Sequence, residues 1–331
     1  MLRKASFLVI AAAAAITLTA CAGNTSSGGT TAASGTLKST AHGKKVTFIV
    51  YADQSTPFFN PVVDGAKAAA KVYGLNLNVE YSGSNDSTQV NQIETASAGG
   101  VSALAVSIPS NTAFTKAICA AHDKGIPVVA FNVTATSGPV LKCVLSFVGQ
   151  DFEQAGYLIA QRLVSEGKVP HGATVFCPVE DPTASYASGR MAGANRALAA
   201  VGAKCDEVST GFDLSQAQTT ETQYLLGHRS TSVILALGQV PLQVAPASVK
   251  AAHTKATIAG FDLSTQISSS IKDGSILATV EQQPYLQGYY AVTQLALNLA
   301  YGSTPSDVNT GNEIVDKANV AKIAALAGTV Y

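Results

Sequence analysis

Ile126-Pro127-Val128-Val129-Ala130-Phe131-Asn132 and Ala256-Thr257-Ile258-Ala259-Gly260-Phe261-Asp262 are two apolar runs of the same length that lie far apart in the chain. Each is typical of a buried strand, and each ends in Phe followed by a polar residue. In open parallel α/β sheets, ligands bind outside the carboxyl ends of the strands. We therefore expect Asn132 and Asp262 to face each other across a cleft. The alternative is that both are turn residues that bond their own backbone.

The sequence around these runs alternates short apolar strands with amphipathic helices. In the first part of the chain we expect strands at 46–51, 75–80, 103–107 and 127–131, and helices near 61–73, 87–98 and 113–124. After a linking stretch at 147–151 the alternation restarts, with helices at 152–166 and 188–201 and strands at 173–177, 232–237 and 257–261. This pattern predicts an α/β fold with parallel sheets in two similar lobes.

The N-terminus has the features of a secretory signal. Leu2-Arg3-Lys4 is positively charged, and the apolar run from 7 to 20 is shorter than the roughly 20 residues of a membrane-spanning helix. It ends at Leu18-Thr19-Ala20-Cys21, which looks like a bacterial lipobox. We expect residues 1–20 to be removed and Cys21 to carry acyl chains that anchor the protein to the membrane, in the cell envelope or periplasm. A secreted protein with a chance cysteine is the alternative.

Composition narrows the classes of function. Residues 21–45 are rich in Gly, Ser and Thr, which is typical of a flexible tether, and the remaining length suits one large domain or two ordinary ones. The net charge is 0 with 13% charged residues, so no basic field indicates a nucleic-acid partner.

The sequence contains no pattern typical of an enzyme. There is no G-x-G-x-x-G motif after a strand, no phosphate loop, no H-E-x-x-H and no nucleophile elbow. The histidines are scattered at His42, His122, His171, His228 and His253. We expect no catalytic residues, no metal and no cofactor.

Four cysteines remain once Cys21 is assigned to the lipid. Their spacing does not resemble a zinc site. If the first two lie in one lobe and the last two in the other, bridges between the lobes would lock any hinge. We therefore predict disulfides Cys119–Cys143 and Cys177–Cys205, with four buried free thiols as the alternative.

Several short motifs appear in the order found in one known family. They are Thr56-Pro57-Phe58-Phe59, Gly65-Ala66, Gly125-Ile126-Pro127-Val128, Gly260-Phe261-Asp262 and Gln282-Gln283-Pro284-Tyr285. From 46 to about 302 the chain resembles the ribose-type periplasmic sugar-binding proteins. This resemblance implies the type I binding-protein fold, with two Rossmann-like lobes, a three-segment hinge and a sugar held in the cleft. It assigns 46–149 and about 283–305 to the N-terminal lobe and 150–282 to the C-terminal lobe, and leaves the lobe of 306–331 open.

The resemblance also implies ligand-binding residues in the first lobe. Phe58 and Phe59 fall where the family places aromatic rings against the sugar, although only one of the two need touch it. Asn132 falls where the family has an Asp that accepts sugar hydroxyls, and an amide can both donate and accept. Gln150 falls where the family has a small polar residue beside the first hinge, and Asp151 follows it. We expect one or both to line the cleft, with a plain hinge role as the alternative.

In the second lobe the resemblance implies five further ligand-binding residues. Arg190 lies near the family's arginine-bearing helix start, where its guanidinium could hold vicinal hydroxyls; a surface arginine is the alternative. Phe212 matches a cleft aromatic residue. Asp262 and Gln282 match the acid and the amide at the cleft. Gly238-Gln239 stands where ribose-binding members have Asn-Asp, so Gln239 could substitute for the missing amide.

These features predict a monomeric solute-binding lipoprotein that delivers a small sugar or polyol to the permease of an ABC importer. Val133 replaces a ligand-binding Arg of the ribose-binding members, which together with Gly238 favours another pentose, a tetritol or pentitol, or a cyclic polyol. The alternative is a sensory lipoprotein that presents its ligand to a chemoreceptor or sensor kinase. Uptake of labelled sugar by a deletion strain separates the two.

Overall fold

The computed structural model describes residues 41–311 and 313–331. The expected signal peptide, the lipidated Cys21 and the tether up to residue 40 lie outside the described residues. Among the helices of the described part, none is both long and apolar enough to cross a membrane.

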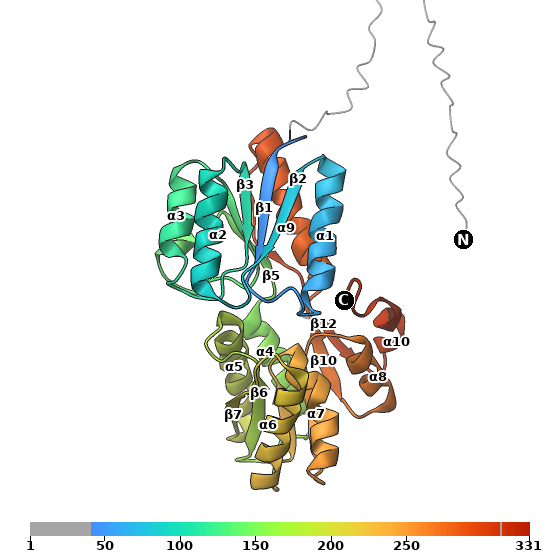
Figure 1. Cartoon of the computed structure of the whole chain (residues 1–331). Coiled ribbons are helices and arrows are strands. Elements are labelled where there is room, and N and C mark those ends of the chain that lie inside the picture. Colours follow the sequence, from blue (N-terminus) through green and yellow to red (C-terminus); the bar gives the residue numbers. More distant parts are fainter. Residues whose placement is uncertain (1–40, 312) are drawn as a thin grey trace, which may run out of the picture. The chain divides into compact units, whose positions relative to one another are not determined.

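The N-terminal lobe is built on a parallel sheet. Its strands are β1 (Lys45–Val50), β2 (Asn76–Tyr81), β3 (Ala103–Val106), β4 (Val128–Asn132), β5 (Ser146–Gly149) and β11 (Val308–Asn309). They lie in the spatial order β11-β5-β4-β3-β1-β2, and all neighbours are parallel. Figure 1 shows α2 (Asp86–Ala98) and α3 (Thr115–Asp123) on one face, and α1 (Phe59–Tyr73) with α9 (Pro284–Tyr301) on the other. The central strands are buried on both faces, which explains their continuous apolar sequences.

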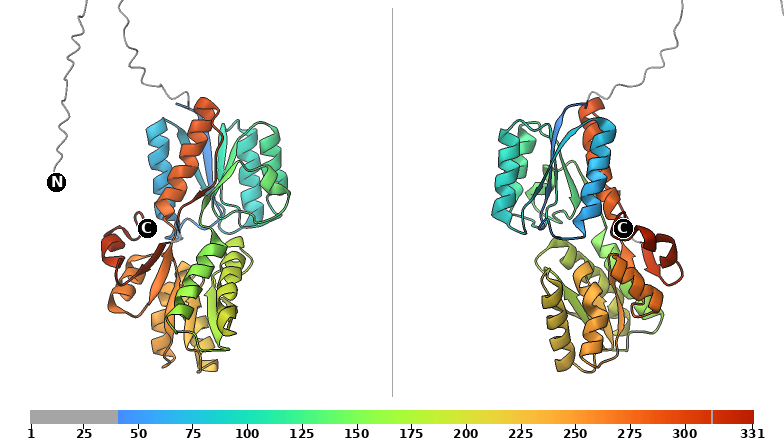
Figure 2. Two further views of the ribbon diagram at one scale, coloured as in Figure 1. Left: turned by 180° about the vertical axis from the view of Figure 1, so that it is seen from behind. Right: turned by 45° about the vertical axis from the view of Figure 1, so that its right-hand side comes forward.

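The C-terminal lobe repeats this plan (Figure 2). Its sheet has the order β12-β10-β9-β8-β6-β7, from β6 (Thr174–Val179), β7 (Lys204–Ser209), β8 (Val233–Ala236), β9 (Thr257–Phe261), β10 (Ala278–Glu281) and β12 (Glu313–Asp316). Only β12 runs antiparallel to its neighbour. The helices are α4 (Phe152–Ser165), α5 (Ser185–Leu198), α6 (Leu214–Gly227), α7 (Gln239–Ala251), α8 (Thr265–Asp273) and α10 (Val320–Ile323). The two lobes therefore have the same strand order and differ in the direction of one edge strand, and the predicted fold class is confirmed.

Some elements differ from the sequence-based expectation. The predicted linking stretch at 147–151 contains strand β5, which pairs with β4. Strand β7 was not expected, because its sequence Lys-Cys-Asp-Glu-Val-Ser has no apolar run. It pairs only with β6 at the edge of the sheet, so it needs little apolar surface.

Glycines let two pairs of helices pack closely. A Cβ atom at Gly65 of α1 or at Gly288 of α9 would overlap the backbone of the facing helix. The same holds for Gly156 of α4 and Gly193 of α5. Because Arg190 lies in α5, the close packing of α4 and α5 also fixes the position of the Arg190 backbone.

The chain passes between the two sheets three times, after β5, after β10 and after β11. These passages are hydrogen-bonded to one another. The Thr310 N–H donates to the Gly149 carbonyl at 2.9 Å, and its hydroxyl donates to the Gln282 carbonyl at 2.7 Å. The Gln150 amide donates to the Gly311 carbonyl at 3.1 Å. The segment whose lobe was left open thus adds β11 to one sheet and β12 to the other.

Both predicted disulfides are present. Cys119 of α3 is bonded to Cys143, which follows a short 3-10 helix, and Cys177 of β6 is bonded to Cys205 of the neighbouring β7. Each bridge lies within one lobe, so neither restrains the passages between the lobes.

Candidate functional site

A cavity of about 470 Å³, partly open to solvent, is lined by residues of both lobes. The lining side chains come mainly from the carboxyl ends of strands and from the loops that follow them. The lining residues are Tyr51, Thr56, Phe58, Phe59, Asn132, Val133, Phe152, Glu180, Tyr186, Arg190, Phe212, Gly238, Gln239, Val240, Asp262 and Gln282.

Asn132 and Asp262 have equivalent positions in the two lobes. Asn132 ends β4 with φ 61°, and Asp262 follows β9 with φ 73°. Asn and Asp are the non-glycine residues that adopt this left-handed conformation most readily. The Asn132 amide donates to the Gln287 Oε1 atom at 3.0 Å, and the Asp262 carboxylate accepts a hydrogen bond from Gln282. Because both side chains bond other segments and line the same cavity, the turn-residue alternative does not describe them.

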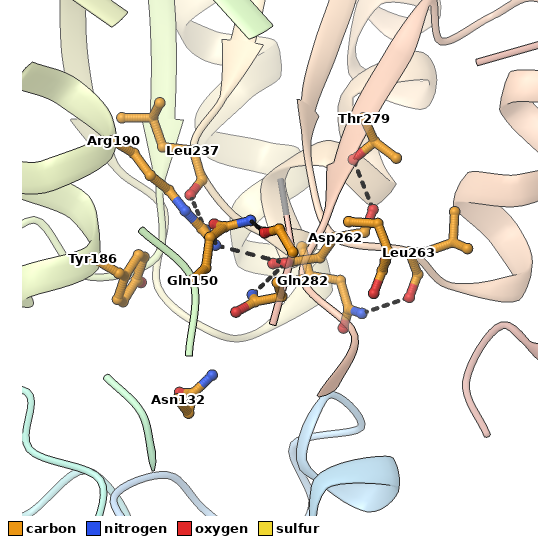
Figure 3. Close-up of polar contacts among 12 residues, drawn as sticks. Asn132, Gln150, Tyr186, Arg190, Leu237, Asp262, Leu263, Thr279 and Gln282 are labelled. Atoms are coloured by element: carbon orange, nitrogen blue, oxygen red, sulfur yellow. Dashed lines mark hydrogen bonds and ion pairs between the residues drawn. The ribbon is translucent and has the colours of Figure 1, made fainter. Parts of the chain in front are cut away.

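Arg190 is a buried residue of the site. The residue is 2% exposed, so the alternative of a surface arginine is wrong. The guanidinium donates to the Leu237 carbonyl at 2.7 Å and to the Gln150 Oε1 atom at 3.0 Å, and lies 3.7 Å from an Asp262 oxygen. It also stacks on Phe261, with its central carbon 4.1 Å from the ring centre. Figure 3 shows Arg190, Asp262 and Gln282 converging, with Asn132 across from them.

Two carboxyl groups of the cavity have raised pKa values. Burial raises the pKa of Asp262, and the nearby guanidinium of Arg190 and the amide of Gln282 partly oppose this effect. Burial also raises the pKa of Glu180, and the hydrogen bond from the Val240 N–H opposes it.

Aromatic rings form the apolar part of the lining. Phe58 and Phe59 both line the cavity and pack edge to face, with ring centres 5.2 Å apart. Tyr51 packs edge to face on Phe59 at 5.4 Å, and Phe212 lines the cavity from the other lobe. Such rings offer flat apolar surfaces to C–H groups of a ligand.

Gln150 and Asp151 do not line the cavity. Gln150 is 1% exposed, and the two ends of its amide bond Arg190 and Gly311, so it connects a cavity residue to the passages between the lobes. Asp151 is exposed and caps α4, where its carboxylate accepts from the Gln154 N–H at 3.0 Å. Gln239 does line the cavity, and its amide donates to the Leu263 carbonyl at 3.1 Å.

The sequence reasoning missed polar residues of the site, including Glu180 and Gln287. Glu180 directly follows β6, so the strand-end rule that found Asn132 and Asp262 would also have found it. Gln287 lies in the first turns of α9 and is fully buried, where its amide bonds the Gln282 side chain at 2.8 Å. No local pattern marks Gln287, because its role depends on contacts between distant segments.

The arrangement suits a neutral polar ligand better than a metal. The described part of the chain contains no group of three or more His, Cys, Asp or Glu side chains that could hold a metal ion. The cavity instead offers amides, carboxyls and one guanidinium beside aromatic faces.

Comparisons with known proteins identify a matching family and several relatives that bind sugars. A family model described as "Periplasmic binding protein domain" matches residues 46–304. A xylose/arabinose-binding protein of Sulfolobus acidocaldarius is 29% identical over 83% of this chain and 72% of its own length. A ribose import binding protein of Bacillus subtilis is 27% identical over 90% of this chain and 94% of its own.

A solved structure agrees with these relatives. The crystal structure of a carbohydrate transporter from Acidothermus cellulolyticus, in complex with myo-inositol, superposes with a TM-score of 0.80. It is 30% identical in sequence and covers 87% of this chain and 99% of its own.

Proposed function

The chain belongs to the periplasmic binding protein domain family, and on this basis we propose that it captures a small neutral sugar or polyol outside the cytoplasm and delivers it to an ABC importer. As a member of this family it is a binding protein and not an enzyme. The observation that carries the proposal is a single cavity in which Asn132 of one lobe meets Arg190, Asp262 and Gln282 of the other.

The chemistry of the lining supports a ligand rich in hydroxyls. Each buried hydroxyl left without a partner costs about 1–3 kcal/mol, so a sugar site must supply many donors and acceptors. Asn132 and Gln282 can do both, Asp262 accepts, and Arg190 donates. Phe58 and Phe212 come from opposite lobes, and their rings would cover the apolar C–H faces of the ligand.

Ligand capture would favour the arrangement in which the lobes enclose the cavity. A ligand that contacts both lobes binds that arrangement more tightly than an open one and so shifts the population toward it. The three hydrogen-bonded passages between the sheets are where the backbone would bend.

The ligand we favour is a pentose or a cyclic polyol. The relatives include a xylose/arabinose-binding protein and a ribose import binding protein, and a structure at 30% identity holds myo-inositol. At position 133 the cavity has valine, which cannot donate to a hydroxyl, and at 238 it has glycine. Both differences favour a ligand other than ribose.

Lipidation at Cys21 would hold the protein at the outer face of the membrane as a monomer near its permease. The sequence Leu18-Thr19-Ala20-Cys21 after an apolar run supports this. Membrane fractionation of the exported protein is the check.

A thermal-shift screen tests the proposed function. The panel contains myo-inositol, D-xylose, L-arabinose, D-ribose, D-glucose and xylitol. A ligand that binds only the folded state adds RT ln(1 + [L]/Kd), or about 2.7 kcal/mol at a concentration of one hundred times Kd. We expect at least one member to raise the unfolding temperature along a saturating curve, whereas exclusion of a sugar from the protein surface gives a small, non-saturating rise. If no member gives a saturating shift, the proposed function is wrong.

A further inference from the structure

Glu180 is a buried acid of the cavity without a basic partner of its own. It is 7% exposed and follows β6 in the C-terminal lobe. Its carboxylate accepts from the Val240 N–H at 2.9 Å and from the Tyr186 hydroxyl at 3.2 Å. Among residues 41–311 and 313–331, no Lys, Arg or His lies within ion-pair distance of it.

Glycine at position 238 leaves room for the Glu180 carboxylate. A Cβ atom on Gly238 would overlap both carboxylate oxygens of Glu180. The backbone of Gly238 is extended, with φ −158°, so its conformation does not require glycine. The space is therefore the reason for glycine at this position, and the Glu180 carboxylate occupies the place that a side chain at 238 would take.

Among the residues that line the cavity, the single basic side chain already lies beside an acid. Arg190 already donates to Leu237 and Gln150 and lies 3.7 Å from Asp262. Glu180 and Asp262 together outnumber the single arginine. A phosphate or carboxylate on the ligand would thus add negative charge to a cavity lined by two buried acids and one arginine, which is unfavourable.

Glu180 retains capacity to bond a ligand. A carboxylate offers about four lone-pair positions, and the two protein donors named above use only part of them. Two oxygens side by side suit two neighbouring hydroxyl groups, each of which donates to one oxygen.

We propose that Glu180 is a specificity-determining residue whose carboxylate accepts hydrogen bonds from vicinal hydroxyls of a neutral polyol ring and excludes phosphorylated or carboxylated analogues. This inference rests on the proposed function, because it assigns the ligand class of the same cavity.

Isothermal titration of Glu180→Gln tests the contact. The probe is whichever of myo-inositol, D-xylose and D-glucose binds the wild type most tightly. Losing a hydrogen bond to a charged group weakens binding by about 10-fold to 100-fold. The matched control is Glu221→Gln, which changes another fully buried acid of the same lobe that does not line the cavity, and its affinity should match the wild type. Equal affinity of Glu180→Gln and wild type, or equal weakening by both variants, would overturn the inference.

Gly238→Ala tests the same contact independently if Glu180→Gln folds poorly. The added methyl group must displace the carboxylate, so affinity for the same probe should fall at least 10-fold. Glu180→Gln combined with Gly238→Ala should lose little beyond the larger single loss, because both changes disturb one contact. Full affinity of Gly238→Ala, or fully additive losses, contradicts the proposal.

The excluding role is tested by comparing the affinities for neutral and anionic ligands in two pairs. These are D-glucose with D-glucuronate and myo-inositol with myo-inositol 1-phosphate. Wild-type protein should bind the neutral member of each pair more tightly. In Glu180→Gln the ratio of the two affinities should be at least 10-fold smaller. An unchanged preference overturns the excluding role. If the wild type binds no neutral probe, the proposed function itself fails, and this result differs from one in which the wild type binds and Glu180→Gln binds equally well.

Discussion

The backbone at Asn132 and Asp262 explains why these residue types stand at the two strand ends. Both have a left-handed φ, which is costly for most side chains and least so for Asn and Asp. This turn leaves the strand while directing the side chain into the cavity. The same residue thus serves the local backbone and supplies a polar group to the ligand.

Asp262→Asn separates these two roles. Asparagine tolerates the left-handed backbone, so the variant should fold, but it removes the charge that faces Arg190 at 3.7 Å. It also replaces one acceptor oxygen with a donor amide. We expect affinity for the best ligand of the screen to fall by at least about 10-fold, as for other hydrogen bonds to charged groups, in isothermal titration.

Asp213→Asn is the matched control. Asp213 is exposed and caps α6 through the Gln216 N–H at 2.8 Å, and asparagine caps helices equally well. Its affinity should be unchanged. If Asp262→Asn also binds normally, Asp262 does not contact the ligand.

At the scale of elements, the helix pairs α1/α9 and α4/α5 are related by the repeat of the lobes. In both pairs the helices approach through glycines, which lowers intrinsic helix stability by about 1 kcal/mol per residue relative to alanine. Close backbone contact compensates for this cost. The pairs connect the lobes to their hinge, because α4 follows the first passage and α9 follows the second.

Gly288→Ala should destabilise the protein despite the higher helix propensity of alanine. Its methyl group would overlap the Val62 carbonyl, and overpacking of this kind costs about 1–3 kcal/mol. Denaturant unfolding measures the change. Gly227→Ala is the control, since nothing lies within 4 Å of a Cβ at the end of α6, and this variant should be neutral or slightly more stable. Stabilisation by Gly288→Ala would show that the helices do not need the glycine.

At the scale of the whole molecule, an acid lies beside the second passage between the lobes. Glu281 ends β10, is 1% exposed and accepts from the Gln283 N–H at 2.6 Å. Burial and the nearby charge of Asp262 raise its pKa from 4.5 to about 8, and Glu313 of the neighbouring strand adds to the repulsion. Gln283 itself has a left-handed backbone with φ 52°, so the strained residue of this passage lies two positions after the acid.

Glu281 should make the folded state less stable as pH rises. Between pH 4.5 and about 8 the folded protein retains a proton that the unfolded chain has lost, so the free energy of unfolding decreases with pH across that window. Glu281→Gln carries no titrating proton and should lessen this decrease, by on the order of 1–3 kcal/mol at pH 8 relative to pH 5.

Urea midpoints of both proteins at pH 5 and pH 8 measure this effect. Part of the slope will remain in the variant, because burial also raises the pKa of Glu180, Asp262 and Glu221. Parallel pH curves for wild type and variant would show that Glu281 does not retain its proton.

The two-lobe α/β fold could be predicted because its signals are local. The apolar strands of a parallel sheet are buried on both faces and are continuous in sequence, so β1, β3, β4 and β9 were found close to their observed bounds. Edge strand β7 and strand β5 were not found, because neither has a long apolar run. The disulfide pairing followed once each cysteine was assigned to a lobe.

The strand ends also indicated a shared cavity for Asn132 and Asp262, since ligands of open α/β sheets bind outside the carboxyl ends of the strands. Only the tertiary structure decided the parts of the site that depend on contacts between distant segments. In the folded chain Gln150 lies outside the cavity and bonds both Arg190 and Gly311. Gln287 of α9 bonds Asn132 and Gln282. The tertiary structure also put the Glu180 carboxylate into the space left by Gly238. Sequence patterns report which face of an element is buried, whereas the partner of a buried polar group is set by how separate elements pack.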